Sequence, residues 1–202
     1  MKCKVQVTTC AFFIDDILCS MQLVVIRHGE TALNKENRLQ GSKGPNEGLN
    51  ETGRAAIVKL RDGLLTTPAA IYASPLERTQ ETASIINERF NIPIITVPEL
   101  MERDFGTLSG KLRSELDDKL IQDDLEGKYD YRPYGGESVE DVKARIMRFL
   151  ETLPLSTDET VLVITHRGVI RVLYDLYPTD GSGDEIVPAS KHIFRVTRMP
   201  AN

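Results

Sequence analysis

The sequence predicts an α/β protein, a three-layer sandwich with a mostly parallel central sheet flanked by helices and a short helical cap. Two almost wholly apolar runs, 23–26 and 161–165, are typical of strands buried on both faces of a sheet. Stretches with helical spacing alternate with the strands along the chain. The 202 residues contain no internal repeat and no low-complexity linker, so we expect one domain with a substantial core.

The composition narrows the class of partner. Apolar residues make up 41% of the chain and charged residues 27%, as in ordinary globular proteins. The net charge of −5 gives no footprint for nucleic acid, and no apolar run approaches the roughly 20 residues that span a bilayer. We therefore expect neither nucleic acid nor a membrane as partner. All three cysteines lie in the first twenty residues, which favours a cytoplasmic location without a disulfide framework.

Residues 1–20 are expected to be an N-terminal extension of a single domain at 21–202. Two lysines and a short apolar stretch resemble a signal peptide, but Asp15 and Asp16 interrupt the apolar stretch and no small-residue cleavage site follows. The spacing of the cysteines matches no zinc pattern. Met21 stands directly before the first strand, where the domain is expected to begin.

The first strand ends directly in Arg27 and His28. In open α/β sheets, ligands bind just beyond the carboxyl ends of the strands, so these two side chains stand where a substrate would bind. A histidine in that position can be a general base, a metal ligand or a nucleophile. The guanidinium beside it favours an anionic substrate, because it matches a phosphate or a carboxylate bidentately.

A second arginine is expected at a second strand end. After a helix capped by Asn50, a short strand at 70–73 runs into Ser74 and Pro75, which are typical of an N-cap and a first helical position. Arg78 then lies in the first turn of the next helix, where the helix dipole also favours an anion.

The remaining elements continue the alternation. A third strand is expected at 94–97, and the acidic stretch 111–134 predicts a surface helix and loop that overhang the site as a cap. Ser138 and Asp141 have the spacing of a capping box at the start of an amphipathic helix. A last strand is expected at 192–197, at the edge of the sheet.

Two of the three histidines follow buried strands. The strand at 161–165 ends at His166, with a glycine close behind, as the first strand ends at His28. His192 lacks this context and is expected to be structural or exposed. Two histidines and two arginines at such strand and helix ends predict an anion-binding site.

Five segments together resemble the histidine phosphatase superfamily, the phosphoglycerate mutase-like proteins. They occur in the order in which that family has them: 23–34 with its Arg-His-Gly-Glu-Thr, then 74–83, 100–106, 136–138 and 165–168. The resemblance spans about residues 21–177. The short first triplet would be weak alone, but the ordered set is specific.

The resemblance implies a phosphoric monoester hydrolase that works through a phosphohistidine, with neither a metal nor another cofactor. His28 would attack phosphorus, and Glu102 would protonate the leaving oxygen and then activate water. Two guanidiniums supply the positioning and charge stabilisation that phosphoryl transfer needs. The residues expected to bind the substrate are Arg27, Asn34, Gln40, Gly41, Arg78, Glu102, His166 and Arg167.

The chain departs from the family pattern at two positions that bear on substrate choice. Arg167 stands where the family usually has a small residue, so it either contacts the phosphate or points to solvent. Ser42 stands where the family usually has a tryptophan. We expect a small phosphate monoester as substrate, with a phosphoprotein as the alternative. Three tyrosines either contact its leaving group or form an aromatic surface turn: Tyr129, Tyr131 and Tyr134.

Several functions stay open at this point. The short stretch between Glu102 and Gly136 favours a phosphatase over a mutase, because the family's glycolytic mutases carry a long insertion there. A metal-dependent hydrolase could use His28, Glu30 and His166, although nearby arginines would repel a divalent cation. A catalytically inactive protein that binds a phosphorylated ligand is a further alternative. The sequence specifies no oligomeric state.

Overall fold

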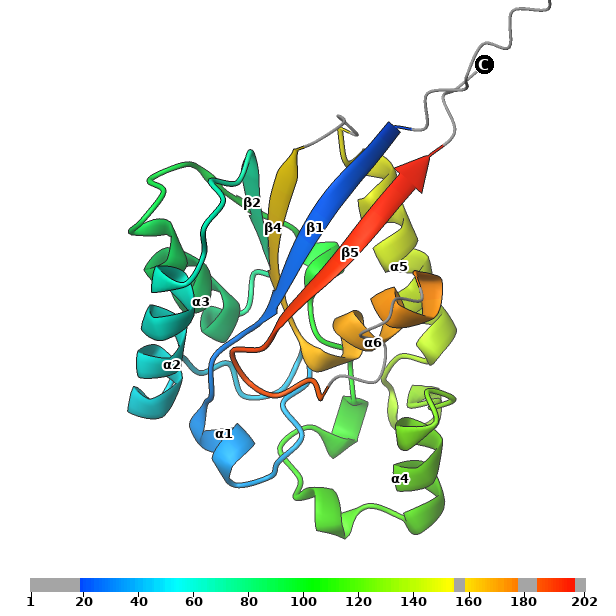
Figure 1. The fold of residues 1–202 in the computed structure, drawn as a ribbon. Coiled ribbons are helices and arrows are strands. Elements are labelled where there is room, and N and C mark those ends of the chain that lie inside the picture. Colours follow the sequence, from blue (N-terminus) through cyan, green and yellow to red (C-terminus); the bar gives the residue numbers. More distant parts are fainter. Residues whose placement is uncertain (1–18, 155–158, 178–184, 199–202) are drawn as a thin grey trace, which may run out of the picture.

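A computed structural model describes residues 19–154, 159–177 and 185–198 of the chain. Its centre is a five-stranded sheet in the order β3-β2-β4-β1-β5 (Figure 1). The strands are β1 (Cys19–Arg27), β2 (Ala70–Ala73), β3 (Ile94–Thr96), β4 (Thr160–Thr165) and β5 (Lys191–Arg198). The first four run parallel and β5 pairs antiparallel with β1 at the edge. The predicted mostly parallel sheet is confirmed.

Helices cover both faces of the sheet, which confirms the three-layer arrangement. On one face lie α2 (Glu51–Asp62) and α3 (Glu77–Asn87), and on the other α5 (Val139–Thr152) and α6 (Arg167–Leu176) (Figure 1). In the part of the chain that the structure describes, no helix is long and apolar enough to cross a membrane.

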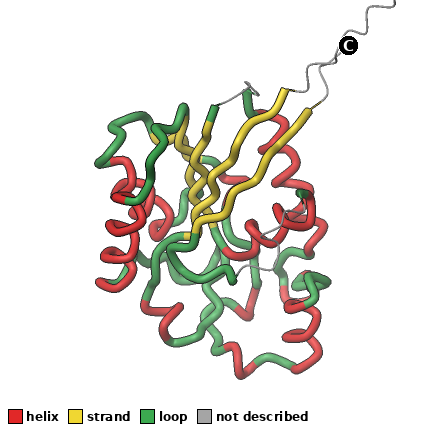
Figure 2. Tube along the Cα trace, in the orientation of Figure 1, coloured by secondary structure: helices red, strands yellow, loops and turns green. Residues whose placement is uncertain are grey.

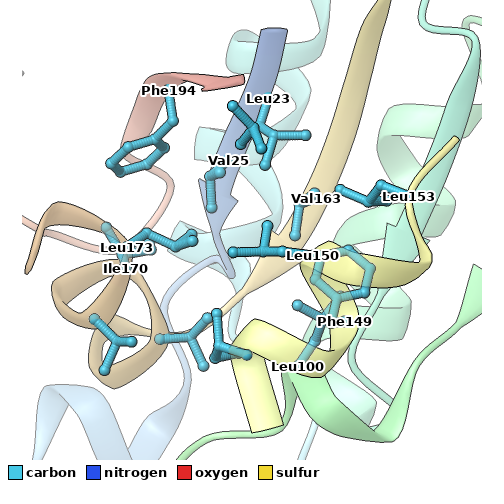
Figure 3. Packing of buried hydrophobic residues seen from close by; sticks show 14 of the residues in the cluster. Leu23, Val25, Leu100, Phe149, Leu150, Leu153, Val163, Ile170, Leu173 and Phe194 are labelled. Atoms are coloured by element: carbon cyan, nitrogen blue, oxygen red, sulfur yellow. The ribbon is translucent and has the colours of Figure 1, made fainter. Parts of the chain in front are cut away.

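Successive residues of the central strands point to opposite cores, as the two-residue period of a strand requires. Leu23 and Val25 pack against α5 and α6, together with Val163 (Figure 3). Val24 and Ile26 belong to the cluster on the side of α2 and α3. Burial on both faces explains why the two strands read as continuous apolar runs.

Loops and short helices gather at the carboxyl ends of the parallel strands (Figure 2). They include α1 (Ala32–Lys35), η1 (Pro98–Leu100), η2 (Gly106–Leu108), η3 (Arg113–Glu115), α4 (Asp118–Leu125) and η4 (Arg132–Tyr134). Segment 111–134, which contains η3, α4 and η4, is called the cap below. A small apolar cluster anchors it, and the members of this cluster are Leu39, Phe105, Leu108, Leu116, Tyr129 and Tyr131.

Some local predictions hold and others need correction. Asn50 caps α2 and accepts a hydrogen bond from the Gly53 N–H, and Ser138 forms the expected capping box with Asp141 at the start of α5. Helix α3, in contrast, begins at Glu77 rather than directly after Ser74.

The expected boundary at residue 21 also shifts. Strand β1 already begins at Cys19, because the backbone at 19 and 20 pairs with Arg198 and Thr197 of β5. The rest of the expected N-terminal extension, 1–18, lies outside the described residues.

Candidate active site

The sheet topology brings the two motif histidines together. Strands β1 and β4 are neighbours, with Arg27 paired to Thr165, so each histidine lies one residue beyond the paired ends. The His28 backbone N–H donates to the Thr165 carbonyl at 3.0 Å, and the rings of His28 and His166 lie 5.1 Å apart between centroids. Segments far apart in the sequence thus meet because parallel strands share one carboxyl edge.

A cavity of about 260 Å³ opens at this edge. It is lined by Arg27, His28, Glu30, Asn34, Asn37, Arg38, Leu39, Gln40, Arg78, Glu102, Arg103, Phe105, Arg113, Arg167 and Pro188. Six of the eight residues predicted to bind the substrate are therefore brought together at one cavity. The other two, Gly41 and His166, are not among the residues that line it.

The environment of His28 leaves it neutral and fixes its tautomer. Its Nδ1 lies 2.7 Å from the Gly29 carbonyl oxygen, which can only accept, so Nδ1 carries the proton and Nε2 keeps its lone pair. Burial lowers the pKa of His28 well below its ordinary value, and the charges of Arg78 and Arg27 lower it further. A neutral imidazole with a free Nε2 is the nucleophilic form of histidine.

Glycine is required directly after this histidine. A Cβ atom at Gly29 would lie 2.9 Å from the Gly53 carbonyl oxygen and 3.0 Å from Ile57 Cγ1 of α2. The Gly29 N–H donates to Thr82 Oγ1 at 3.1 Å. The close approach of α2 and α3 therefore holds the backbone that carries His28.

Arg27 and Arg78 reach the cavity with donors to spare. Burial lowers the pKa of each to about 10, which leaves both protonated at neutral pH. Arg27 donates from Nη1 to the Ile186 carbonyl at 2.8 Å, and Arg78 donates from Nη2 to the Gln40 carbonyl at 2.8 Å. Arg27 Nε and Arg78 Nε and Nη1 are buried without a hydrogen-bond partner among the described residues. A buried donor without an acceptor lowers the stability of a folded protein. An anion that accepts hydrogen bonds from these donors would therefore bind favourably.

His166 is fully buried beside His28. Its Nε2 lies 2.9 Å from Ser74 Oγ, while Nδ1 is buried without a partner among the described residues. Burial lowers its pKa well below the ordinary value, and the charge of Arg78 adds to the effect. Ser74 Oγ also accepts from the Leu76 N–H at 3.4 Å, ahead of the first residue of α3.

Glu102 is held at the cavity edge by backbone N–H groups. Its Oε1 accepts from the Arg103 N–H at 2.9 Å, and its Oε2 accepts from the Gly168 N–H at 3.3 Å. A Cβ atom at position 168 would lie 2.3 Å from Glu102 Oε1, so any larger residue there would displace the carboxylate.

Gln40 and Gly41, two of the residues predicted to bind the substrate, form hydrogen bonds mainly within the protein. The Gln40 side chain accepts from Thr31 Oγ1 at 3.0 Å and donates to Glu47 Oε1 at 3.3 Å. The carbonyls of Gln40 and Gly41 accept from Arg78 Nη2 at 2.8 and 3.4 Å. These two residues thus position an arginine at the cavity.

The side chain of Asn34 is fixed in a capping box at the cavity. Its Oδ1 accepts from the Thr31 N–H at 3.2 Å, and the Asn34 N–H donates to Thr31 Oγ1 at 3.2 Å. The side-chain nitrogen Nδ2 of Asn34 takes no part in this box, and Asn34 lines the cavity.

Tyr129 and Tyr131 do not form the predicted aromatic surface turn. The two side chains are buried, neither lines the cavity, and their ring centres lie 4.4 and 5.7 Å from the Arg103 guanidinium. His192 is buried and hydrogen-bonded to Tyr174 and Ser190. Of the two predictions for it, structural or exposed, the structural one is confirmed.

Sequence reasoning missed Arg38, Arg103 and Arg113, which also line the cavity. Arg103 directly follows Glu102, so its position in the acid motif was an available signal. Asp124 of α4, which pairs with Arg103 at 2.5 Å and with Arg113 at 3.0 Å, carried no such signal. Within the described ranges, no group of three or more histidine, cysteine or acidic side chains is placed to hold a metal ion.

Comparison with known proteins gives one consistent family. The model of the histidine phosphatase superfamily (branch 1) matches residues 23–180. A metal-independent phosphoserine phosphatase of Arabidopsis thaliana is 34% identical over 185 residues, which cover 85% of this chain and 75% of the relative. A 2,3-bisphosphoglycerate-dependent phosphoglycerate mutase of Azorhizobium caulinodans is 30% identical, with 86% and 91% covered.

Solved structures agree with the fold. The crystal structure of TTHB049 from Thermus thermophilus superposes with a TM-score of 0.71 at 32% identity, covering 86% of this chain and 92% of that chain. A mycobacterial glucosyl-3-phosphoglycerate phosphatase in complex with VO3 superposes with a TM-score of 0.70 at 25% identity, covering 88% and 97%.

Proposed function

The chain belongs to the histidine phosphatase superfamily, and we propose that it hydrolyses a small phosphate monoester through a phosphohistidine at His28. One observation carries the proposal. Buried nitrogen atoms of Arg27, Arg78 and His166 lack partners among the described residues, and they lie around a neutral histidine whose Nε2 is free. A phosphoryl group would supply the acceptors that these nitrogen atoms lack.

The reaction divides into two steps. In the first, His28 Nε2 forms a bond to phosphorus, the bond from phosphorus to the ester oxygen breaks, and the leaving oxygen takes a proton from Glu102. In the second, a water oxygen attacks the phosphohistidine, Glu102 takes a proton from that water, and inorganic phosphate leaves as His28 is restored. Arg27 and Arg78 offset the negative charge on the phosphoryl oxygens in both transition states.

A small substrate fits the cavity best. Its volume of about 260 Å³ lies just below the roughly 300–1,000 Å³ of typical small-molecule sites. Two of the similar proteins are named for activity on phosphoserine and on glucosyl-3-phosphoglycerate, both small phosphorylated compounds. A phosphoprotein substrate is therefore less favoured. The cytoplasmic location stays a prediction from the cysteine distribution.

Phosphoglycerate mutase-type transfer is the second candidate, supported by the similarity to a mutase of Azorhizobium caulinodans. The short cap supports hydrolysis, because a mutase must keep water away from the phosphohistidine while its intermediate reorients. The two reactions differ in their product. Hydrolysis releases inorganic phosphate, whereas a mutase returns the phosphoryl group to a second hydroxyl.

The test is a labelling experiment with radiolabelled phosphate monoesters. We expect acid-labile, base-stable label on the wild type and release of inorganic phosphate, and neither from His28→Ala. His192→Gln is the matched control, because His192 is a buried histidine outside the cavity, and it should keep both signals once circular dichroism shows that it is folded. Hydrolysis by His28→Ala at the wild-type rate would overturn the proposal.

The same assay separates the remaining alternatives. We expect the rate to persist in excess chelator, and its loss there would favour a metal-dependent hydrolase. Label that moves to another hydroxyl without release of phosphate would favour the mutase. Tight binding of monoesters without label or turnover would favour an inactive binding protein.

A further inference from the structure

The motif segment 136–138 contributes no residue to the lining of the cavity. It lies instead against segment 99–104, which contains the predicted proton donor and is called the acid segment below. A Cβ atom at Gly136 would lie 2.3 Å from the Asp104 carbonyl oxygen. The Glu137 N–H donates to that carbonyl at 2.9 Å, and Glu137 Oε2 accepts from the Asp104 N–H at 2.9 Å. The motif therefore binds the last residue of the acid segment.

Arg145 of α5 connects this motif to the other end of the acid segment. Its Nε and Nη2 donate to Glu137 Oε1 and Oε2 at 3.0 and 3.2 Å, which makes a bidentate ion pair. Its Nη1 donates to the Glu99 and Met101 carbonyls at 2.5 and 2.8 Å. All three nitrogen atoms of one buried guanidinium thus have acceptors, and two of these acceptors lie just before Glu102 in the chain.

The acid segment depends on such side-chain contacts. Beyond the end of η1, residues 101–104 form neither helix nor strand, so the carbonyl groups of the segment need partners outside regular structure. The Leu100 carbonyl, between the two that Arg145 binds, accepts from Thr165 Oγ1 at 2.7 Å. Three successive carbonyls are therefore held by side chains of α5 and β4.

The Glu102 carboxylate has few contacts of its own. One oxygen accepts from the N–H of Arg103, which belongs to the same segment, and the other accepts from the Gly168 N–H at 3.3 Å. Among the described residues, no further hydrogen bond holds this carboxylate. Its place in the cavity therefore follows the backbone of the acid segment, which Arg145 and Glu137 hold.

Resting on the proposed function, we infer that Arg145 and Glu137 are positioning residues that keep the Glu102 carboxyl within reach of the leaving oxygen. Neither residue lines the cavity, so they act on the ester only through Glu102. A displacement of about 1 Å at a reacting group can lower a rate by about 10²-fold. An ion pair that served only the stability of the fold would instead affect all substrates alike.

The test compares esters that need a proton on the leaving oxygen with one that does not. The alkyl esters are O-phosphoserine and glycerol 3-phosphate, and the reference is p-nitrophenyl phosphate. Arg145→Lys keeps the positive charge, but a compact ammonium group cannot span the four acceptors of the guanidinium. We expect its kcat to fall about 10–100-fold for the alkyl esters and less than about threefold for the nitrophenyl ester. Arg148→Lys is the matched control, since Arg148 is an exposed arginine of α5 outside the cavity, and it should keep both rates.

A double-variant cycle shows whether Arg145 acts through Glu102. If it does, Arg145→Lys should lower kcat for the alkyl esters no further once Glu102→Gln has removed the proton donor. Losses that multiply in the double variant would mean that Arg145 acts by another route, and they would overturn the inference.

Glu137→Gln is a second, milder variant for the same role. Its amide keeps an oxygen for the Asp104 N–H or for Arg145 but loses the charge of the ion pair, so we expect the same selective loss, by about tenfold at most. Glu151→Gln, at an exposed glutamate of α5 outside the cavity, is its control. Circular dichroism and urea unfolding establish that each variant is folded before its kinetics are measured.

The outcomes separate this inference from the phosphatase proposal. Parallel losses for alkyl and nitrophenyl esters in folded Arg145→Lys and Glu137→Gln would leave the phosphatase standing and reject the positioning role. Wild-type rates in both variants would do the same. Failure of the wild type to hydrolyse any of the three esters would reject both.

Discussion

Arg78 and Arg103 both line the cavity and are both buried, with 1% and 2% of their surface exposed, yet the protein holds them differently. Arg78 donates to backbone carbonyls and forms no ion pair with a described residue. Arg103 forms an ion pair with Asp124 at 2.5 Å and lies 4.4 Å from the centre of the Tyr129 ring. Burial lowers the pKa of Arg78 to about 10, whereas Asp124 and Glu102 outweigh burial and raise the pKa of Arg103.

The difference separates a buried arginine that the fold leaves without an ion-pair partner among the described residues from one that the fold has paired. An unpaired buried charge destabilises the free protein, and a ligand of opposite charge recovers that free energy on binding. A paired buried charge already has its partner, so removing one member of the pair leaves the other buried without a counter-charge and destabilises the protein. Under the proposed function, Arg78 is therefore available to bind phosphate, whereas Arg103 is already paired with Asp124 of the cap.

Arg78→Met should produce the largest change in activity with no loss of stability. We expect kcat/KM to fall by about 10³-fold or more, because an arginine on a transferring phosphoryl group contributes roughly 10³–10⁵-fold. The free energy of unfolding should stay level or rise, since a buried charge without an ion-pair partner among the described residues is removed. Steady-state kinetics and urea unfolding measure both, with Arg148→Met as control. A loss of stability as large as that of Arg103→Met would contradict the difference between the two arginines.

Arg103→Met should produce the largest loss of stability. The substitution leaves Asp124, 1% exposed, with only Arg113 and Arg171 among the described residues, and breaking a buried pair costs about 3–5 kcal/mol. We expect a value near the lower end from urea unfolding, because two partners remain. The double variant Arg103→Met with Asp124→Leu should recover part of the loss. If it is no more stable than the single variant, the ion pair is not the cause.

Glu102→Gln should lower the rate of the chemical step without a large loss of stability, because glutamine can keep the contact to the Arg103 N–H. Glutamine keeps an oxygen for the Arg103 N–H but cannot deliver the proton, so we expect kcat for alkyl phosphates to fall about 10²–10³-fold. The loss should be much smaller for p-nitrophenyl phosphate, whose leaving group needs no proton. Equal losses for both esters would contradict a role as general acid.

The pH dependence of stability should be the smallest effect, and it should come from the two buried histidines His28 and His166. His28 and His166 are buried with lowered pKa values, whereas the unfolded chain takes up protons near pH 6.5. Below that pH the unfolded state binds more protons, so the free energy of unfolding should decrease as the pH falls, by up to about 1.4 kcal/mol per unit for each histidine. Urea unfolding at pH 7.5 and 5.5 measures the slope, which should flatten in a His28→Asn, His166→Asn variant.

The ion pairs of Asp124 should change the free energy of unfolding only at lower pH. Burial alone would raise the pKa of Asp124, but Arg103 and Arg113 outweigh it and lower the pKa below the ordinary 3.8. Its stabilising contribution is therefore complete above about pH 4 and is lost as the pH falls further. An unchanged slope between pH 7.5 and 5.5 in Asp124→Asn would agree with this difference.

Local pattern in the sequence accounts for much of the fold and for the main residues of the candidate site. The apolar runs before His28 and His166, the cap at Asn50 and the capping box at Ser138 each depend on neighbours a few residues away, so spacing alone predicts them. The ordered motifs likewise predicted Arg27, Arg78 and Glu102 at one cavity. These features follow from the local periods of strands and helices and from the shared carboxyl edge of parallel strands.

Contacts between distant segments were decided by the tertiary structure. The sequence did not indicate that Asp124 pairs with Arg103, that Tyr129 packs on that arginine, or that Ser74 contacts His166. Nor did it decide whether Arg167 meets solvent or the cavity, which it lines. The physical reason is that contacts between residues far apart in the sequence depend on how the elements pack in three dimensions. The local periodicity of strands and helices carries no information about that packing.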